Sequence, residues 1–237
     1  MTQVIVALDV DTLKRQEELL KALKGVVVWY KVGLQLFTAH GKRAVDLVRR
    51  NGGKVFLDLK LHDIPQTVAH AVREAQKLGV DAVSLHLMGG ADMARAAAEV
   101  CPRPKLWGVT VLTSMAPEDV KLFHPSARIP AMVKTLAEAG RVAGVDATIC
   151  SPQEVAYLRK SLPRLELKFV TPGIRPKGAA LNDQSRVMTP GEAAALGIDF
   201  IVVGRPITHA PDPRKAALGI LAEMQSEVPS ALMKERP

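Results

Sequence analysis

Short apolar runs rich in Val and Ile recur along the chain, each about the length of one buried strand. Runs of this kind, separated by segments with a different periodicity, are typical of strands that are covered on both faces. We therefore predict strands at residues 4–9, 26–31, 54–60, 82–86, 106–111, 147–150, 167–170 and 200–204.

Segments with helical periodicity lie between these runs. In the clearest one, apolar residues from Val68 to Leu78 recur at every third or fourth position. Pro65 stands where a first helical turn favours proline, and Gly79 stands where a helix commonly ends. Further helices are predicted at residues 12–23, 40–51, 91–99, 130–142, 152–160, 190–196 and 213–226.

The alternation of strands and helices predicts a parallel sheet, because parallel strands need crossover connections. Eight β/α units in 237 residues match the size of a closed (β/α)8 TIM barrel, so we predict a single α/β barrel domain over residues 1–237. A doubly wound open sheet is the alternative, although no G-x-G-x-x-G motif follows the first predicted strand. Residues 228–237 are expected to be a loose tail.

Composition narrows the class of protein. The chain is 48% hydrophobic and only 4% aromatic, so aliphatic residues and alanine are expected to fill most of the core. The net charge of +8 suits an anionic ligand, but no Lys/Arg block is interleaved with aromatic residues as in nucleic-acid binders. No apolar run reaches the roughly 18 residues of a membrane span, and the first residues lack a signal-peptide pattern. We expect a cytoplasmic protein that binds neither nucleic acid nor membrane.

Charged residues end three consecutive predicted strands. Asp9 ends the first, Lys31 the second, and Asp58 and Lys60 the third, with Asp63 in the turn that follows. Functional groups of a TIM barrel collect at these strand ends, and Asp58 and Lys60 should share a face, roughly 6–7 Å apart along the strand. Each residue alone could be a cap or a solvated charge. Together, their alternating signs predict a paired network in one site, where carboxylates hold a lysine in its charged form.

A second cluster follows the last two predicted strands, in the segments TPGIRPKG and VVGRPI. Phosphate sites of TIM barrels are often built from these two loops. Gly173 and Gly204 allow the backbone to approach an anion, and Arg175 and Arg205 offer forked donors that suit phosphate. A helix after Gly204 would direct its first amides at the same anion.

The segment 172–190 is long for a barrel loop. Long loops in compact domains are often lids, so we predict that it closes over a phosphate. Gln184 in this segment is a candidate additional phosphate donor.

Several motifs resemble those of the orotidine 5′-phosphate decarboxylase family. FLDLKLHDIPQT contains its Asp-x-Lys-x-x-Asp-Ile signature, and VALDV, KVGLQLF, VTVLTSM, TPGIR, NDQSRV and VVGRPI resemble its other blocks in order, over residues 4–207. The resemblance implies decarboxylation of orotidine 5′-phosphate to uridine 5′-phosphate (UMP) in pyrimidine biosynthesis, with no metal and no organic cofactor.

The resemblance also implies residue roles. Lys60 is the proton donor to the ring carbon that loses CO2, and Asp58 lies against the substrate carboxylate. Lys31 and Asp63 complete the catalytic set, with Asp63 supplied by the other subunit of a homodimer. The substrate-binding set implied by the resemblance is Asp9, Lys31, Asp58, Asp63, Ile64, Thr67, Thr113, Ser114, Arg175, Gln184, Gly204 and Arg205.

Within this set, Asp9 and Lys31 are expected to bind the ribose together with Thr67 of the partner subunit. Thr113 and Ser114 stand where the family contacts ribose or base, and the last four residues are expected to hold the phosphate. His86, at the end of the fourth predicted strand, is expected to support the site.

Three other functions remain open at this point. A metal-dependent sugar-phosphate decarboxylase of the same superfamily typically has a glutamate in place of Lys31. A Schiff-base aldolase would need Lys60 with a lowered pKa, which neighbouring carboxylates oppose. A non-catalytic phosphate-binding or nucleic-acid-binding barrel leaves the charged strand ends unexplained.

Overall fold

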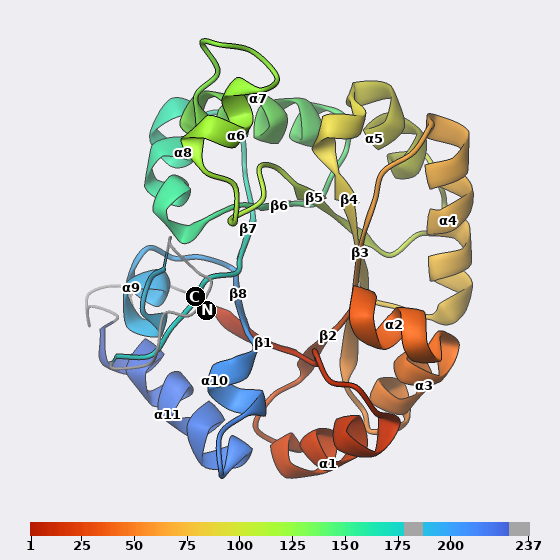
Figure 1. Cartoon of the computed structure of the whole chain (residues 1–237), viewed down its shortest axis with the longest axis vertical. Helices are drawn as coiled ribbons and strands as arrows, with labels where there is room; N and C mark the ends of the chain where they lie inside the picture. The colour runs from red at the N-terminus through yellow and green to blue at the C-terminus, as the bar shows by residue number, and fades with distance from the viewer. Residues whose placement is uncertain (178–186, 228–237) are drawn as a thin grey trace, which may run out of the picture.

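The computed structural model describes residues 1–177 and 187–227. Within this part of the chain, eight parallel strands close into a barrel in the order β1 to β8, and β1 pairs with β8. Figure 1 shows the helices as a ring outside the strands, which confirms the predicted (β/α)8 architecture. The strands are β1 (Gln3–Ala7), β2 (Trp29–Gly33), β3 (Lys54–Leu61), β4 (Ala82–His86), β5 (Lys105–Val109), β6 (Ala147–Ile149), β7 (Phe169–Thr171) and β8 (Phe200–Val203).

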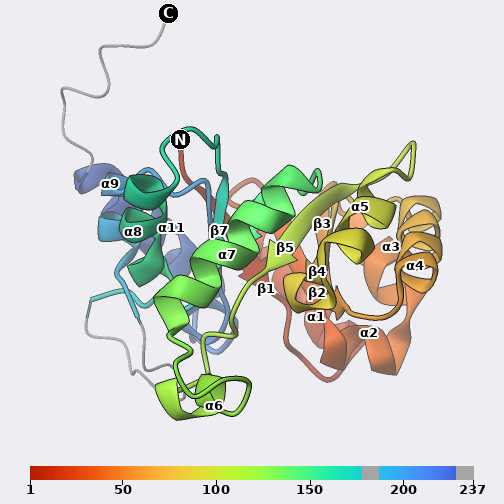
Figure 2. The same ribbon diagram turned by 90° about the horizontal axis from the view of Figure 1, so that it is seen from above.

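The helices connect successive strands. They are α1 (Leu13–Leu23), α2 (Leu34–His40), α3 (Lys42–Arg50), α4 (Pro65–Leu78), α5 (Ala91–Ala98), α6 (Pro117–Lys121), α7 (Ile129–Val142), α8 (Val155–Ser161), α9 (Pro190–Ala195), α10 (Arg205–Thr208) and α11 (Pro213–Ser226), with 3-10 turns η1 (Leu87–Gly89) and η2 (Pro152–Glu154). Figure 2 shows the N-terminus on one side of the barrel and α6 on the opposite side. No helix in the described ranges is long and apolar enough to span a bilayer.

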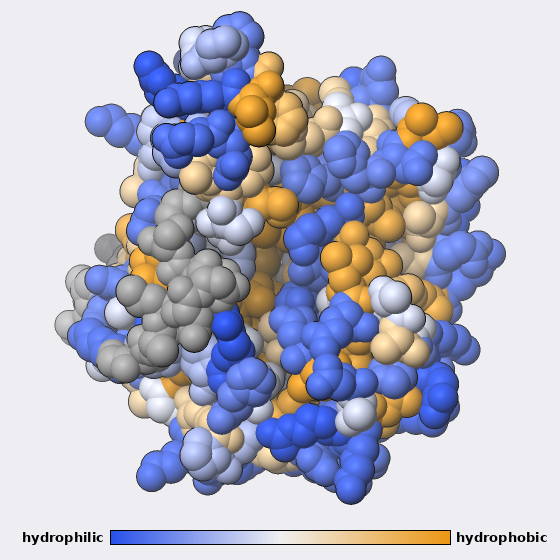
Figure 3. Space-filling view, in the orientation of Figure 1, coloured by the Kyte–Doolittle hydropathy of each residue, from blue (hydrophilic) through white to orange (hydrophobic). Residues whose placement is uncertain are grey.

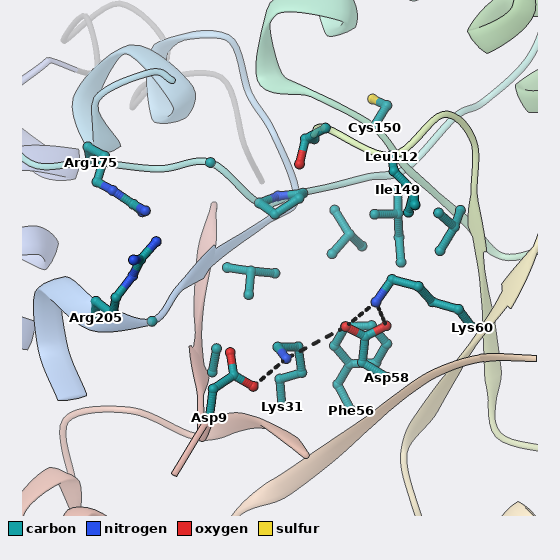
Figure 4. A pocket seen from close by; sticks show the side chains of 18 of the residues that line it. Asp9, Lys31, Phe56, Asp58, Lys60, Leu112, Ile149, Cys150, Arg175 and Arg205 are labelled. Atoms are coloured by element: carbon teal, nitrogen blue, oxygen red, sulfur yellow. Dashed lines mark hydrogen bonds and ion pairs between the residues drawn. The ribbon is translucent and has the colours of Figure 1, made fainter. Parts of the chain in front are cut away.

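The second strand differs from its predicted range. Its predicted start is not strand, because the N–H groups of Val26 and Val27 both donate to the Leu23 carbonyl in the turn after α1. The strand therefore begins at Trp29 and continues to Gly33, two residues beyond the expected end. Lys31 consequently lies inside the strand, where its side chain points into the barrel mouth (Figure 4).

The predicted helix at 40–51 also differs, because α2 and α3 are separate helices. Gly41 separates them with a φ of 54°, a conformation that glycine adopts without steric cost. The short helix α6 escaped the sequence analysis, since five residues carry too little periodicity to detect.

The core is mainly aliphatic, as expected, but the interior of the barrel also holds a cluster of four aromatic side chains. Trp29, Phe56, Trp107 and Phe200 pack together with ring centroids 4.4–5.4 Å apart. The chain has few aromatic residues, but large side chains are needed to fill the interior of an eight-stranded barrel. Val, Leu, Ile and Ala instead fill the layer between strands and helices. The aromatic layer supports the floor of the cavity described next.

Candidate active site

A cavity of about 480 Å³ opens at the carboxyl ends of the strands. Its lining comes from residues as distant in sequence as Asp9 and Arg205, because all parallel strands end at the same mouth. The floor is apolar and includes Phe56, Val109 and Ile149. Figure 3 shows the hollow from this face, with hydrophobic surface at depth and hydrophilic residues along its rim.

Four charged side chains form a chain of contacts on one wall of this cavity (Figure 4). Lys31 Nζ lies 2.9 Å from Asp9 Oδ1 and 3.7 Å from Asp58 Oδ2. Lys60 Nζ lies 3.0 Å from each oxygen of Asp58. The predicted network of alternating charges is therefore present, and Asp58 is its central member.

Gly33 makes room for this network at the end of β2. A Cβ at this position would lie 2.7 Å from Lys31 Nζ and 3.0 Å from Asp9 Oδ1. Gly33 also pairs with Asp58 across the β2–β3 ladder, so the two strands place the ion pairs side by side.

Lys60 reaches the cavity through an irregular strand rather than the regular one that we expected. Its φ is 52°, and among the described residues it is the one non-glycine residue with a positive φ. The β3–β4 register shifts between Leu57 and Leu61, so the backbone bulges at this point. Strained backbone of this kind occurs preferentially at functional sites.

The ionised form of Asp58 is strongly favoured. Burial by itself raises the pKa of this carboxyl, but the charges of Lys31 and Lys60 and hydrogen bonds from Lys60 and Ser84 outweigh it, so the pKa lies below its usual range. The side chains of Lys31 and Asp58 are only 12% and 11% exposed, so solvent screens their attraction weakly. The site thus holds a buried carboxylate between two ammonium groups.

Two arginines lie on the side of the cavity opposite Lys60, and Figure 4 shows their guanidinium groups facing one another. Arg175 is buried and its Nη1 donates to the Ile174 carbonyl. Its backbone N–H donates to the Met188 carbonyl, which joins the two ends of the loop after β7. Arg205 begins α10 directly after Gly204, and both line the cavity. Two facing cations favour an anionic group between them.

The predicted site residues divide into three groups. Asp9, Lys31, Asp58, Lys60, Thr113, Arg175, Gly204 and Arg205 line the cavity. Asp63, Ile64 and Thr67 are exposed outside it, and Ser114 is exposed beside it without lining it. Gln184, with residues 178–186 of the predicted lid 172–190, and the predicted tail 228–237 lie outside the described residues.

His86 stands next to the site rather than in it. It ends β4 and stacks on His62, with ring centroids 5.4 Å apart and planes at 21°. Burial, followed by electrostatic interaction with His62 and with Lys60, lowers the pKa of His86 and favours its neutral form. It is therefore suited to packing beside Lys60 without adding a charge.

Ser84 and the apolar floor escaped the sequence analysis. Ser84 is buried in β4 and hydrogen-bonds Asp58 at 2.8 Å. The only signal in the sequence is one serine within the apolar run AVSLH, which is too weak to identify a site. Thr208 and His209 also line the cavity, and they lie just after the VVGRPI motif that contains Arg205.

The donor set disfavours a metal between the carboxylates. The Lys31 ammonium already lies between Asp9 and Asp58 and would repel a cation there. In the part of the chain that the structure describes, no three His, Cys, Asp or Glu side chains cluster as metal ligands.

Comparison with known proteins identifies the relatives of this chain. Residues 2–220 match the family described as orotidine 5′-phosphate decarboxylase / HUMPS family. Orotidine 5′-phosphate decarboxylase of Syntrophotalea carbinolica is 45% identical over 94% of both chains, and that of Opitutus terrae is 46% identical over 94% of this chain and 98% of its own.

The fold has relatives among solved structures as well. The crystal structure of orotidine 5′-phosphate decarboxylase from Lactobacillus acidophilus matches with a TM-score of 0.82 and 35% identity, over 94% of this chain and 99% of that one. Sequence and structure agree with the resemblance inferred from the motifs. The chain belongs to the orotidine 5′-phosphate decarboxylase / HUMPS family.

Proposed function

We propose that this protein decarboxylates orotidine 5′-phosphate to UMP and CO2 in pyrimidine biosynthesis. The observation that carries the proposal is the array of Asp9, Lys31, Asp58 and Lys60 in one cavity with a facing pair of arginines. Family membership supplies the substrate, and this array supplies the means of acting on it.

The chemical step uses the ammonium of Lys60. The bond between the ring carbon and the carboxylate breaks, and its electron pair stays on the carbon as CO2 leaves. A cation at that carbon stabilises the developing negative charge. Lys60 then transfers a proton to the carbon, becomes a neutral amine, and regains a proton from solvent. Its two contacts with Asp58 hold the ammonium group in position before substrate binds.

Asp58 has a second role in this proposal, next to the substrate carboxylate. Its pKa is low because Lys31 and Lys60 outweigh the effect of burial, so it stays ionised when the substrate binds. Two carboxylates at short range repel each other, and departure of neutral CO2 moves the substrate's charge from its carboxylate to the ring carbon beside the Lys60 ammonium. The apolar floor gives the neutral product CO2 a compatible surface.

The remaining residues bind the rest of the nucleotide. Arg175, Arg205 and the backbone at Gly204 are proposed to hold the phosphate, and Thr113, which also lines the cavity, is proposed to contact the ribose or the base. Asp9 and Lys31 are proposed to bind ribose hydroxyls. Binding energy from the distant phosphate can hold the reacting ring against Lys60 and thereby raise turnover.

We further propose a homodimer in the cytoplasm. Asp63, Ile64 and Thr67 are exposed outside their own cavity, and Ile64 is 67% exposed although apolar. A partner subunit that covers this surface would receive Asp63 and Thr67 at its own site. Ser114, exposed beside the cavity, is proposed to contact substrate once it is bound.

The test follows loss of orotidine 5′-phosphate absorbance with a chelator present. The wild type is expected to turn over, and Lys60→Ala is expected to lose about 10⁴-fold in kcat/KM, the upper end of what a positioned proton donor contributes. Lys77→Ala is the matched control, because Lys77 pairs with Glu74 on the exposed face of α4.

The outcomes separate the proposal from its rivals. No turnover by the wild type, or full turnover by Lys60→Ala, contradicts the assignment. Turnover that the chelator abolishes would favour the metal-dependent decarboxylase. Trapping of a substrate adduct on Lys60 with borohydride would favour the Schiff-base aldolase.

A further inference from the structure

Ser84 lies in the middle of β4, between the apolar Val83 and Leu85, and is fully buried. Burying a hydroxyl lowers the stability of the fold unless the hydroxyl is hydrogen-bonded, so the hydrogen-bond partners of Ser84 indicate its role. Both partners of Ser84 are on β3, and both are residues of the charged array.

The hydroxyl of Ser84 joins Asp58 to the backbone of Lys60. The Lys60 N–H donates to Ser84 Oγ at 2.8 Å, and Ser84 Oγ donates to Asp58 Oδ1 at 2.8 Å. A serine hydroxyl has one hydrogen to donate, and here that hydrogen is directed to the carboxylate. The same carboxylate accepts both contacts from Lys60 Nζ at 3.0 Å. Ser84, Asp58 and Lys60 therefore form a closed ring of contacts.

This ring spans the irregular part of the β3–β4 ladder. Leu57 pairs with Val83 and Leu61 pairs with Leu85, so four steps along β3 correspond to two along β4. Residues 58–60 leave the regular pairing, and Lys60 adopts a φ of 52°. The backbone N–H of Lys60 donates to the side chain of Ser84 on the neighbouring strand instead of to a backbone carbonyl. The hydroxyl thus takes the place of a ladder hydrogen bond at the bulge.

We propose that Ser84 is a positioning residue, whose hydroxyl fixes the Asp58 carboxylate and the bulged backbone of Lys60 relative to each other. It does not itself line the cavity, and it acts through Asp58 and Lys60, which do. This inference rests on the proposed decarboxylation, because the rate of that reaction is what depends on the position of the Lys60 ammonium.

The first test is Ser84→Ala, measured for kcat and KM with orotidine 5′-phosphate. We expect kcat to fall roughly 10-fold to 100-fold, since a misplacement of about 1 Å near the chemistry can cost about 100-fold. KM is expected to change little, because the phosphate and ribose contacts are elsewhere in the cavity. A purely structural role would lower the melting temperature and leave kcat of the folded protein unchanged.

The second readout is the acid limb of the pH profile of kcat/KM. Ser84 donates to the charged form of Asp58, so its removal raises the pKa of that carboxyl. Activity depends on ionised Asp58, so the acid limb of Ser84→Ala should move to higher pH than that of the wild type. Loss of packing alone does not predict such a shift.

Thr148→Val is the matched control. Thr148 is a buried hydroxyl residue on strand β6, and it does not line the cavity. This variant should keep the wild-type kcat and acid limb. If it loses activity as Ser84→Ala does, or if Ser84→Ala keeps both wild-type values, the inference is wrong.

Two further outcomes are decisive. If Ser84→Ala does not fold, Ser84→Cys replaces it, since a thiol fills the site but makes weaker hydrogen bonds, and the same two criteria apply. An inactive wild type overturns the proposed function together with this inference. An active wild type with an unaffected Ser84 variant overturns the inference alone.

Discussion

Gly33 lies beside the ion pair of Lys31 and Asp9, and its missing side chain is part of the site. Its φ of −97° is open to other residues, so backbone conformation does not require glycine here. What requires it is space, because an added Cβ would meet Lys31 Nζ at 2.7 Å and Asp9 Oδ1 at 3.0 Å. Both atoms are at the ends of flexible side chains, and they can move while the fold stays intact.

Gly33→Ala is therefore expected to damage activity more than stability. The added methyl group displaces Lys31 from Asp9, and kcat/KM should fall roughly 10-fold to 100-fold for a displacement of about 1 Å. Steady-state kinetics and a thermal melt measure the two effects. Gly219→Ala in α11 is the control, because its added Cβ meets nothing within 4 Å. An unchanged kcat/KM in Gly33→Ala would show that this ion pair does not govern the reaction.

At the scale of elements, β3 carries two charged residues of the array and also the irregularity of the sheet. A left-handed conformation costs a non-glycine residue roughly 1–2 kcal/mol, so placing lysine rather than glycine at position 60 lowers stability. Natural proteins keep such strain where function requires the side chain. The strand appears regular in sequence because its apolar alternation continues through Leu61.

Replacing Lys60 with two different residues separates strain from charge. Lys60→Gly and Lys60→Ala both remove the ammonium, but glycine relieves the left-handed conformation at some entropic cost to folding. We expect the glycine variant to have a free energy of unfolding about 0.5–1 kcal/mol higher than the alanine variant. Urea unfolding of both proteins measures the difference.

Lys54, at the start of the same strand, provides the control pair. It is exposed and has no positive φ, so Lys54→Gly should be less stable than Lys54→Ala. If glycine is the less stable replacement at position 60 as well, the backbone strain at Lys60 is not a significant energetic feature.

At the scale of the whole molecule, barrel closure brings Asp9 and Arg205 into one cavity although they lie near opposite ends of the sequence. Closure also separates the residues of the Asp-x-Lys-x-x-Asp signature, because two of them lie in β3 and the third lies in the turn that follows. Asp58 and Lys60 face inward, whereas Asp63 is exposed outside the cavity. All three charged residues of the signature can act at one site if Asp63 enters the cavity of a second copy of the chain.

Mixing two inactive variants tests this exchange. Lys60→Ala and Asp63→Ala should each have little activity, and hybrid dimers should regain it, because one of their two sites receives Lys60 from one subunit and Asp63 from the other. Activity of the mixture after subunit exchange is the measurement. Lys60→Ala mixed with Lys31→Ala is the control, since both residues act within one chain and no site is restored. A mixture of the first pair that stays inactive would contradict the exchange of Asp63.

Much of the fold could be predicted from the sequence for a local reason. Buried parallel strands and amphipathic helices have different periodicities, and the helix from Pro65 to Leu78 has the predicted bounds. The charges Asp9, Lys31, Asp58 and Lys60 were recognisable because each follows or ends an apolar run, where burial makes a charge costly unless it is paired. Strand order then makes them neighbours before any coordinate is known.

Only the tertiary structure decided how these groups meet. The bulge at Lys60 depends on pairing with β4, and the role of Ser84 depends on that same pairing, so neither has a signal within its own segment. The aromatic cluster inside the barrel likewise depends on which residues face the axis after closure. Periodicity is a property of one segment, whereas hydrogen-bond partners, strain and packing belong to pairs of segments that the sequence keeps apart.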